Sequence, residues 1–277
     1  MKFTKMHGCG NDYVYVNCLK ETVDHPEEVA KKISDRHFGV GSDGLILICP
    51  SEIADFRMKM YNSDGSEGAM CGNGVRCIAK YVYDYGLTDK TFISLETKAG
   101  IKYLDLTVED GKVTMVKVDM GAPITNPEDI PAVSEKDIIV SEPIMVDGTE
   151  YKITCVSMGN PHGVVFVEDT DQIEIETIGP KFEHHEMFPD RTNTEFIQVI
   201  DRGHIKMRVW ERGAGETLAC GTGTCASVYA CILNGYTDHS VDVEVLGGTI
   251  HIDYDEEKHT IFMTGPAAVV FDGEIDL

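Results

Sequence analysis

Two stretches of the chain decide the fold, FRMKMYNSDGSEGAMCGNGVRCIAKYVYDYGLTD at residues 56–89 and IKMRVWERGAGETLACGTGTCASVYACILNGYTD at residues 205–238. They align without a gap at a single offset of 220 − 71 = 149 positions. Eight of the 34 aligned pairs are identical, where composition alone gives roughly two. The identities that form a glycine turn are Cys71/Cys220, Gly72/Gly221 and Gly74/Gly223. The match indicates an internal duplication.

Each copy covers about 120 to 140 residues, which is the size of a domain and not of a solenoid repeat. The boundary falls in GAPITNPEDI at 121–130, a stretch rich in Gly, Pro and Asn. The terminal AVVFDGEIDL lies outside the second copy, and we expect it to add a strand to the first lobe. The predicted domains are therefore an N-terminal lobe, 1–121 plus 267–277, and a C-terminal lobe, 122–266.

Strands dominate the predicted secondary structure. Alternating or β-branched stretches predict strands at 56–61, 112–120, 151–156, 205–210 and 241–246. Helices are predicted over 26–37, 73–85 and 222–234; the last two follow the glycine turns and stop at Gly86 and Gly235. The fold class is α+β, with two pseudo-symmetric lobes that each hold one buried helix.

Charge and composition exclude several classes of protein. With 24 Lys+Arg and 47 Asp+Glu the net charge is −23, which disfavours nucleic-acid partners and anionic membrane surfaces. No apolar run reaches the roughly 18 residues of a membrane span. Nine cysteines, an odd number, with no apolar signal segment, predict a reducing cytoplasmic compartment.

Each copy places a cysteine where a strand leads into a helix, in CGNG at 71–74 and CGTG at 220–223. A helix N-terminus carries partial positive charge and unpaired N–H groups, which lower the pKa of a nearby thiol and bind anions. Zinc is a competing use of cysteines, but Cys77 and Cys225 fall at +6 and +5 from Cys71 and Cys220, so the duplication does not preserve a ligand set. We expect no metal.

Two equivalent thiols suit inversion at one carbon, because one removes a proton from one face and the other returns a proton to the opposite face. A thiol hydrolase needs one cysteine and a histidine, and a dithiol oxidoreductase keeps its cysteines in one short motif. Two alternatives stay open: a two-thiol racemase for another amino acid, and a binding or redox module in which the pair forms a reversible disulfide.

Six motifs, which cover nearly the whole chain in order, resemble diaminopimelate epimerase. They are MHGCGND (6–12), GVGSDG (39–44), YNSDGSEGAMCGNGVRC (61–77), MGNPH (158–162), RTNTEF (191–196) and WERGAGETLACGTGTCA (210–226). The resemblance implies barrel-like curved sheets around the central helices and interconversion of LL- and meso-2,6-diaminopimelate in lysine and peptidoglycan precursor synthesis. It implies no pyridoxal phosphate, metal or other cofactor, a small amino-acid substrate, and a homodimer.

The resemblance also implies residue roles. Cys71 and Cys220 are the acid/base pair, and His162 with Glu211 tunes the thiols. The implied substrate-binding residues are Asn11, Asn62, Gly72, Asn73, Asn160, Asn193, Glu211, Arg212, Gly221 and Thr222. Two positions depart from many relatives: Gly44 stands where some carry Gln, and Phe271 where many carry a tyrosine linked to dimer formation.

Overall fold

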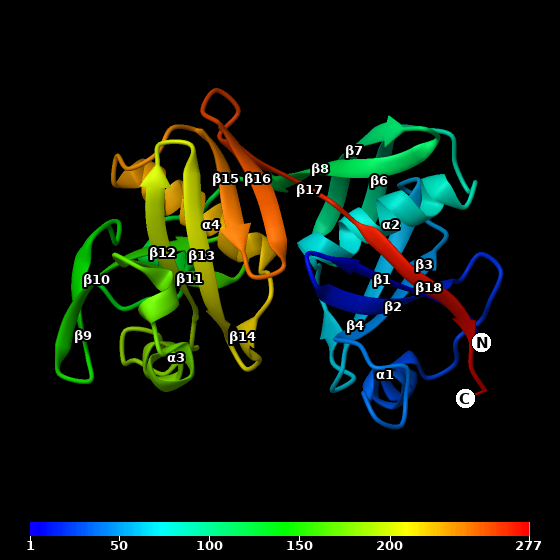
Figure 1. Ribbon diagram of the computed structural model, residues 1–277, viewed down its shortest axis with the longest axis horizontal. Coiled ribbons are helices and arrows are strands. Elements are labelled where there is room, and N and C mark those ends of the chain that lie inside the picture. The colour runs from blue at the N-terminus through cyan, green and yellow to red at the C-terminus, as the bar shows by residue number, and fades with distance from the viewer. Residues whose placement is uncertain (277) are drawn as a thin grey trace. The chain divides into compact units, whose positions relative to one another are not determined.

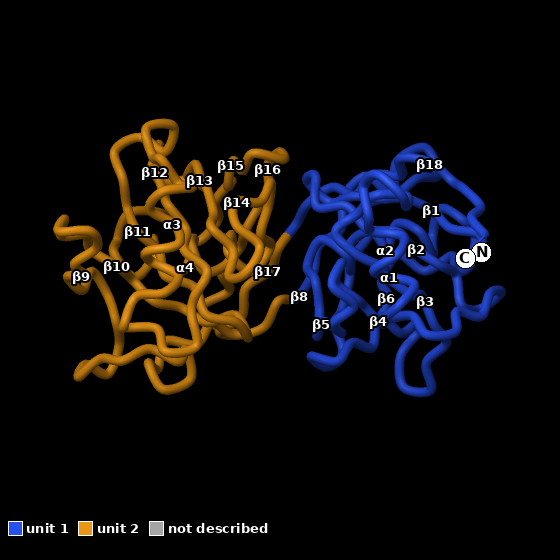
Figure 2. The backbone as a smooth tube through the Cα atoms, turned by 90° about the horizontal axis from the view of Figure 1, so that it is seen from below, with its two compact units in different colours: residues 1–119, 264–277 blue, residues 120–263 orange. Residues whose placement is uncertain are grey.

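The computed structural model describes residues 1–276 and divides into two compact units (Figure 2). Unit 1 comprises Met1–Asp119 and Thr264–Leu277, and unit 2 comprises Met120–Met263. Within the described residues, no helix is both long and apolar enough to cross a membrane.

Unit 1 is a mixed sheet with two helices (Figure 1). Its elements are β1 (Lys2–Gly8), β2 (Asn11–Asn17), α1 (Pro26–Ser34), β3 (Gly44–Cys49), β4 (Phe56–Asn62), β5 (Glu67–Gly68), α2 (Gly72–Asp84), β6 (Phe92–Thr97), β7 (Gly100–Glu109), β8 (Lys112–Gly121) and β18 (Ala268–Glu274). The strands pair in the order β18-β1-β2-β3-β4-β6-β7-β8, with β5 added to β4. The pairs β2–β3 and β4–β6 are parallel and the others antiparallel. The C-terminal strand β18 thus forms an edge beside β1 at the start of the chain.

Unit 2 repeats this plan. Its elements are η1 (Pro127–Asp129), β9 (Glu142–Val146), β10 (Thr149–Ser157), β11 (Pro161–Phe166), η2 (Thr170–Gln172), α3 (Ile175–Glu183), β12 (Asn193–Asp201), β13 (His204–Glu211), β14 (Gly215–Thr217), α4 (Gly221–Leu233), β15 (Ser240–Val245), β16 (Gly248–Asp255) and β17 (Thr260–Gly265). The order β9-β10-β11-β12-β13-β15-β16 has β14 on β13, and parallel pairs at β11–β12 and β13–β15.

The duplication holds at the level of strand register. Helices α2 and α4 are offset by 221 − 72 = 149 residues at their first positions and by 233 − 84 = 149 at their last. The parallel pair Tyr13↔Gly44 in unit 1 corresponds at that offset to His162↔Asn193 in unit 2. Equivalent residues therefore occupy equivalent places beside the two helices. The predicted fold class, α+β with two similar curved-sheet lobes, is confirmed.

Both faces of the central strands are buried, which explains apolar runs such as LILIC. Val14, Val16, Leu45 and Leu47 pack with α1 residues in one core cluster. The alternate residue Ile46 points to the other face, where its Cδ1 lies close to Gly74 of α2. Helix α2 is accordingly buried over most of its length, from Gly72 to Val82.

The sequence did not predict α3. This helix contains Pro180, has no side-chain N-cap hydrogen bond and spans only nine residues. Proline usually ends a helix because it lacks the N–H donor, so the local signal is weak. Tertiary packing stabilises the helix instead: its Phe182 lies edge-on to Phe196 of β12, with ring centroids 5.6 Å apart.

Candidate active site

In unit 1, Cys71 is the N-cap residue of α2. Its backbone is extended (φ −129°, ψ 121°), and the chain turns helical at Gly72. The half-buried thiol donates to Asn11 Oδ1 at 3.3 Å and accepts the Gly74 N–H at 3.4 Å. The strand entry and the glycine turn therefore place a sulfur at the positive end of a buried helix, where an anion is stabilised.

Two charged groups fix the amides around Cys71. Asn11 donates from Nδ2 to the Asp43 carboxylate at 2.8 Å, so its Oδ1 faces the thiol. Asn73 accepts at Oδ1 from Arg76 at 2.8 Å, so its Nδ2 faces Asn11 Oδ1 at 3.3 Å. A carboxylate only accepts and a guanidinium only donates, so both amide orientations are determined.

Arg76 is a fully buried cation, with 0% exposure. It also donates to the carbonyls of Gly72 and Pro266, at 3.4 and 3.3 Å. Near the other end of the network, burial and then the neighbouring Asp12 raise the pKa of Asp43. Arg36 bridges Asp12 and Asp43 at 3.2 and 3.0 Å. The half-site of unit 1 thus lies between a buried cation and a carboxylate pair.

Asn62, which was also predicted to bind substrate, ends β4 and begins a turn. Its Nδ2 donates to Ser66 Oγ at 3.0 Å, and its backbone N–H donates to the Ser66 carbonyl. The structure gives Asn62 this local role in shaping the turn that leads to β5.

In unit 2, Cys220 holds the equivalent N-cap position of α4, with φ −116° and ψ 109°. Its side chain is 6% exposed, and its sulfur lies 3.5 Å from Thr222 Oγ1. Burial raises the pKa of this thiol well above its usual value, and Glu211 and Glu195 add to the effect. Hydrogen bonds from Thr222 and Gly223 act in the opposite direction.

His162 lies fully buried beside this thiol. Its Nδ1 is 2.6 Å from Glu195 Oε1, and its Nε2 is 3.2 Å from Asn160 Oδ1. The carboxylate that is hydrogen-bonded to His162 is thus Glu195, whereas Glu211 accepts a hydrogen bond from the Thr217 hydroxyl. Asn160 in turn donates to Thr222 Oγ1 at 3.2 Å.

The two predicted residues Asn193 and Arg212 are joined through the backbone. Asn193 donates to the Pro161 carbonyl at 2.8 Å and accepts the Arg212 N–H at 2.9 Å. The exposed Arg212 side chain donates to the Asp190 carbonyl at 3.0 Å. Asn193 therefore positions the segment that carries Glu211 and Arg212.

Sequence reasoning missed two buried charged residues of the half-sites, Glu195 and Arg76. Glu195 lies in the quoted motif RTNTEF, and its position among the first, buried residues of the strand is a signal that could have found it. The duplication obscured both residues, since Glu195 corresponds to Ile46 and Arg76 corresponds to Cys225 at the 149-residue offset.

One group among the described residues has metal-ligand character. Donor atoms of His162, Glu195 and Cys220 lie within 4.8 Å of one another. Both imidazole nitrogens already have hydrogen-bond partners, so a metal would have to displace Glu195 or Asn160. The donor set therefore fits a proton-handling group better than a metal site.

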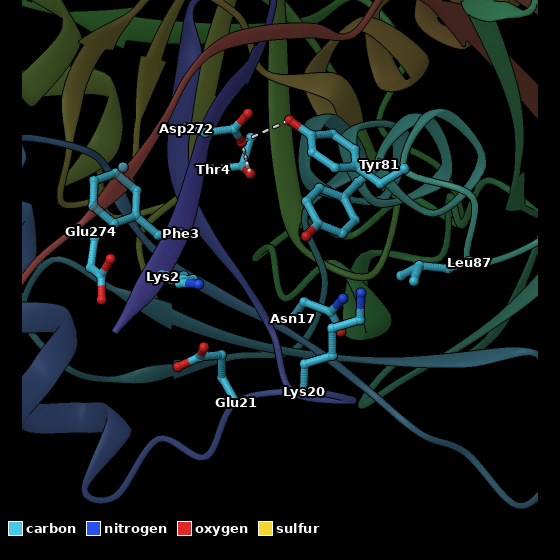
Figure 3. A pocket seen from close by; sticks show the side chains of 12 residues that line it. Lys2, Phe3, Thr4, Asn17, Lys20, Glu21, Tyr81, Leu87, Asp272 and Glu274 are labelled. Atoms are coloured by element: carbon cyan, nitrogen blue, oxygen red, sulfur yellow. Dashed lines mark hydrogen bonds between the residues drawn. The ribbon is translucent and has the colours of Figure 1, made fainter.

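A pocket of about 440 Å³ in unit 1 is separate from these residues. Its walls include Lys2, Asn17, Lys20 and Tyr81, and Thr4 donates to Asp272 at its rim (Figure 3). None of the predicted site residues lines it, and it contains no cysteine or histidine.

Comparison with known proteins identifies the family of the chain. The family model "Diaminopimelate epimerase" matches residues 3–125 and 154–270. A diaminopimelate epimerase from Acetivibrio thermocellus is 61% identical over 277 residues, covering 100% of this chain and 99% of that protein. Among solved structures, a Bacillus anthracis phenazine biosynthesis protein of the PhzF family superposes with a TM-score of 0.73 at 21% identity, covering 100% of this chain and 99% of that one.

A hydroxyproline epimerase from Agrobacterium vitis, solved with bound trans-4-hydroxy-L-proline, superposes with a TM-score of 0.72 at 13% identity. The match covers 99% of this chain and 90% of that one. At such low identities the two solved structures establish the shared fold, whereas the family model and the close relative establish the family. The chain belongs to the diaminopimelate epimerase family of isomerases.

Proposed function

We propose that this enzyme interconverts LL- and meso-2,6-diaminopimelate by proton transfer between Cys71 and Cys220. One observation carries the proposal: each thiol is the N-cap of a buried helix, and the two helices are equivalent copies in the duplicated chain. The duplication thus supplies two acid/base groups of the same kind, as inversion of one carbon requires.

In the LL-to-meso direction the Cys71 thiolate takes the α-proton, so a C–H bond breaks and an S–H bond forms. The electron pair left on carbon is delocalised into the adjacent carboxylate. Cys220 then gives its S–H proton to the opposite face of that carbon and becomes the thiolate. The substrate loses one proton and receives one, so its composition is unchanged. In the reverse reaction the two thiols exchange roles.

Backbone donors supply the stabilisation of the developing charge. Gly72-Asn73 and Gly221-Thr222 lie in the first turns of α2 and α4, where N–H groups lack helical partners. We propose that they bind the reacting α-carboxylate and hold the negative charge formed on deprotonation. No pyridoxal phosphate, metal or other cofactor enters this scheme.

The remaining polar residues are proposed to recognise the rest of the substrate. Arg212 suits the distal carboxylate because a guanidinium binds a carboxylate in a bidentate manner. Glu211 suits an ammonium group, and Asn11, Asn62, Asn160 and Asn193 offer neutral donors and acceptors. The product enters lysine and peptidoglycan precursor synthesis under this proposal.

Incubation with LL-diaminopimelate in deuterated water tests the function. We expect mass spectrometry to detect deuterium at one α-carbon of the substrate. Cys71→Ser and Cys220→Ser should lose inversion because a hydroxyl is a far weaker acid than a thiol. Cys18→Ser is the control, since Cys18 packs against the cluster on the α1 face of the sheet. Exchange of proline alone would indicate another racemase, and no exchange under reducing conditions would favour a redox module.

We further propose that the two lobes, 1–121 with 267–277 and 122–266, each contribute one thiol, and that the enzyme is a cytoplasmic homodimer. Support for the dimer comes from β18, where Val270 and Phe271 are 52% and 45% exposed. Phe271 packs edge-on against Phe3, with ring centroids 5.9 Å apart. Sedimentation of the wild type and of Phe271→Asp tests this assignment; a wild-type monomer would refute it.

A further inference from the structure

A continuous series of hydrogen-bond contacts links a buried carboxylate to the proposed acid/base thiol of unit 2. It runs from Glu195 to His162 (2.6 Å), to Asn160 (3.2 Å), to Thr222 (3.2 Å) and to the sulfur of Cys220 (3.5 Å). Three strands or helices contribute, β11, β12 and α4, together with the turn before β11. We call these five residues the Glu195 relay.

The relay has a direction. Glu195 is 0% exposed, and its Oε2 has no hydrogen-bond partner among the described residues. The side chain in contact with this carboxylate is the His162 imidazole, and a neighbouring cation stabilises a buried carboxylate. The Nδ1–H of an imidazolium donates to Glu195, which leaves the Nε2–H to donate to Asn160 Oδ1.

The remaining links follow from that orientation. Since Asn160 accepts at Oδ1, its Nδ2 donates to Thr222 Oγ1. The Thr222 oxygen is then an acceptor on that side, and across its 3.5 Å contact with Cys220 Sγ, where either atom can donate, the hydroxyl proton is the one that a thiolate accepts. With Cys220 as the thiolate, every donor from Nε2 onward points toward the sulfur, and such an aligned chain of dipoles favours the negative charge there.

The equivalent positions of unit 1 lack the carboxylate. Ile46 stands in place of Glu195: a Cβ on Gly74 would meet Ile46 Cδ1 at 2.7 Å, as a Cβ on Gly223 would meet Glu195 Oε1 at 2.7 Å. The amide beside Cys71 also presents an acceptor, Asn11 Oδ1, to the thiol. The contrast lies in the side-chain partners: Asn11 accepts from the Cys71 thiol, whereas the relay directs the Thr222 hydroxyl to the Cys220 sulfur.

We propose that Glu195 is a positioning residue, which holds His162 as the imidazolium so that the relay delivers a donor hydrogen bond to the sulfur of Cys220. The inference rests on the proposed function only for its catalytic consequence, which is that Cys220 becomes an effective base in the meso-to-LL direction. The relay itself is a property of the free enzyme.

The relay and a simple charge effect predict opposite changes in the reactivity of Cys220 when the charge of Glu195 is removed. Burial and the carboxylates Glu211 and Glu195 raise the pKa of Cys220. Glu195 also acts on a second buried thiol, Cys155, whose pKa is raised by burial and then by Glu142 and Glu195. As a bare anion, Glu195 would disfavour the thiolate, so removing its charge would make Cys220 more reactive. If Glu195 instead holds an imidazolium, removing the Glu195 charge also removes the positive charge on His162. The donor chain is then lost, and Cys220 becomes less reactive.

Alkylation of the free enzyme by iodoacetamide at mildly alkaline pH measures the thiolate fraction of Cys220, with the modified peptide quantified by mass spectrometry. We expect Glu195→Gln to slow the modification of Cys220 by about tenfold, which corresponds to a rise of about one unit in the pKa of its thiol. The rate at Cys71 stays unchanged. Ile46→Val, at the equivalent position of unit 1, is the matched control and leaves Cys220 unaffected.

A second pair of variants tests the far end of the relay without changing the buried charge. Thr222→Val removes the hydroxyl and slows the alkylation of Cys220, whereas Thr222→Ser keeps the hydroxyl and retains the wild-type rate. Faster or unchanged modification of Cys220 in Glu195→Gln overturns the proposal, as does a Thr222→Val rate equal to the wild type.

The catalytic consequence is measured separately. In Glu195→Gln the acid limb of kcat/KM for the meso-to-LL reaction moves to higher pH by the same amount as the alkylation profile. If the wild type fails to exchange deuterium into diaminopimelate, the proposed function is wrong while the alkylation result still decides the relay. If exchange occurs and the two profiles of the variant move in opposite directions, the relay is refuted.

Discussion

The duplication provides a controlled comparison at one backbone position, Gly223 of unit 2 and Gly74 of unit 1. A methyl group on Gly223 would lie 2.7 Å from Glu195 Oε1, 3.2 Å from Cys220 Cβ and 3.3 Å from Cys220 Sγ. Relief to an ordinary contact of 3.4 Å requires a movement of 3.4 − 2.7 = 0.7 Å by the carboxylate oxygen. That oxygen is fully buried and held 2.6 Å from His162 Nδ1.

The free energy of Gly223→Ala follows from three contributions. Overpacking costs about 1–3 kcal/mol, and a weakened charge-assisted hydrogen bond costs about 1.5–3 kcal/mol. Replacing glycine by alanine in a helix returns about 1 kcal/mol. We expect Gly223→Ala to lower the free energy of unfolding by about 1.5–5 kcal/mol, the sum of these contributions, and to impair inversion because Glu195 and Cys220 both have to move.

In Gly74→Ala, Cys71 Cβ lies at an ordinary 3.4 Å, and the two tight contacts are with the ends of flexible side chains, Ile46 Cδ1 at 2.7 Å and Met58 Cε at 3.0 Å. These groups can rotate away, and the helix-propensity gain offsets most of the remaining cost, so the expected change is below about 1 kcal/mol. Urea unfolding followed by circular dichroism compares both variants. Fluorescence of Trp210, the single tryptophan, reports on unit 2. Equal losses in the two variants, or a stabilised Gly223→Ala, would refute the reasoning.

Three further outcomes are expected. Arg76→Met leaves Asn73 Oδ1 without its buried cationic donor and should lower the unfolding free energy by about 3 kcal/mol in calorimetry; a loss below about 1 kcal/mol would contradict the assigned role. Burial raises the pKa of Cys77 to about 12 from 9.0, so its contribution to stability is complete below pH 9.0 and is lost as pH rises toward 12; thermal midpoints measured across that range should fall less in Cys77→Ala. Gly179→Ala would place a methyl group 2.5 Å from the Trp210 ring, so we expect altered tryptophan emission and reduced stability, and an unchanged spectrum would show that the ring is not held against α3.

The sequence predicted what depends on local pattern and on repetition. The 149-residue offset located both thiols, and the glycine stops brought the predicted ends of α2 and α4 to within one residue of Asp84 and Leu233. The same offset matches Asn11 with Asn160. In the structure Asn11 is hydrogen-bonded to Cys71, and Asn160 to Thr222.

What escaped prediction depends on contacts between distant strands. The partner of His162 is decided by the parallel pairing of β11 with β12, which brings a residue 33 positions away into hydrogen-bond distance. No local pattern encodes that choice, and Glu211, which adjoins the arginine in WERGAGET, was the more visible carboxylate. Arg76 likewise shows its buried role only once α2 is packed.

The position of β18 has a consequence for synthesis of the chain. Strand β1 begins at Lys2, yet its partner on one side, β18, ends at Glu274, and Asp272 of that strand accepts hydrogen bonds from Thr4 and Tyr85. A ribosome therefore releases every residue of unit 2 before unit 1 has its last strand. The half of the molecule that is made first is the half that is completed last, and until then its first strand exposes an edge that a chaperone or a second nascent chain can occupy.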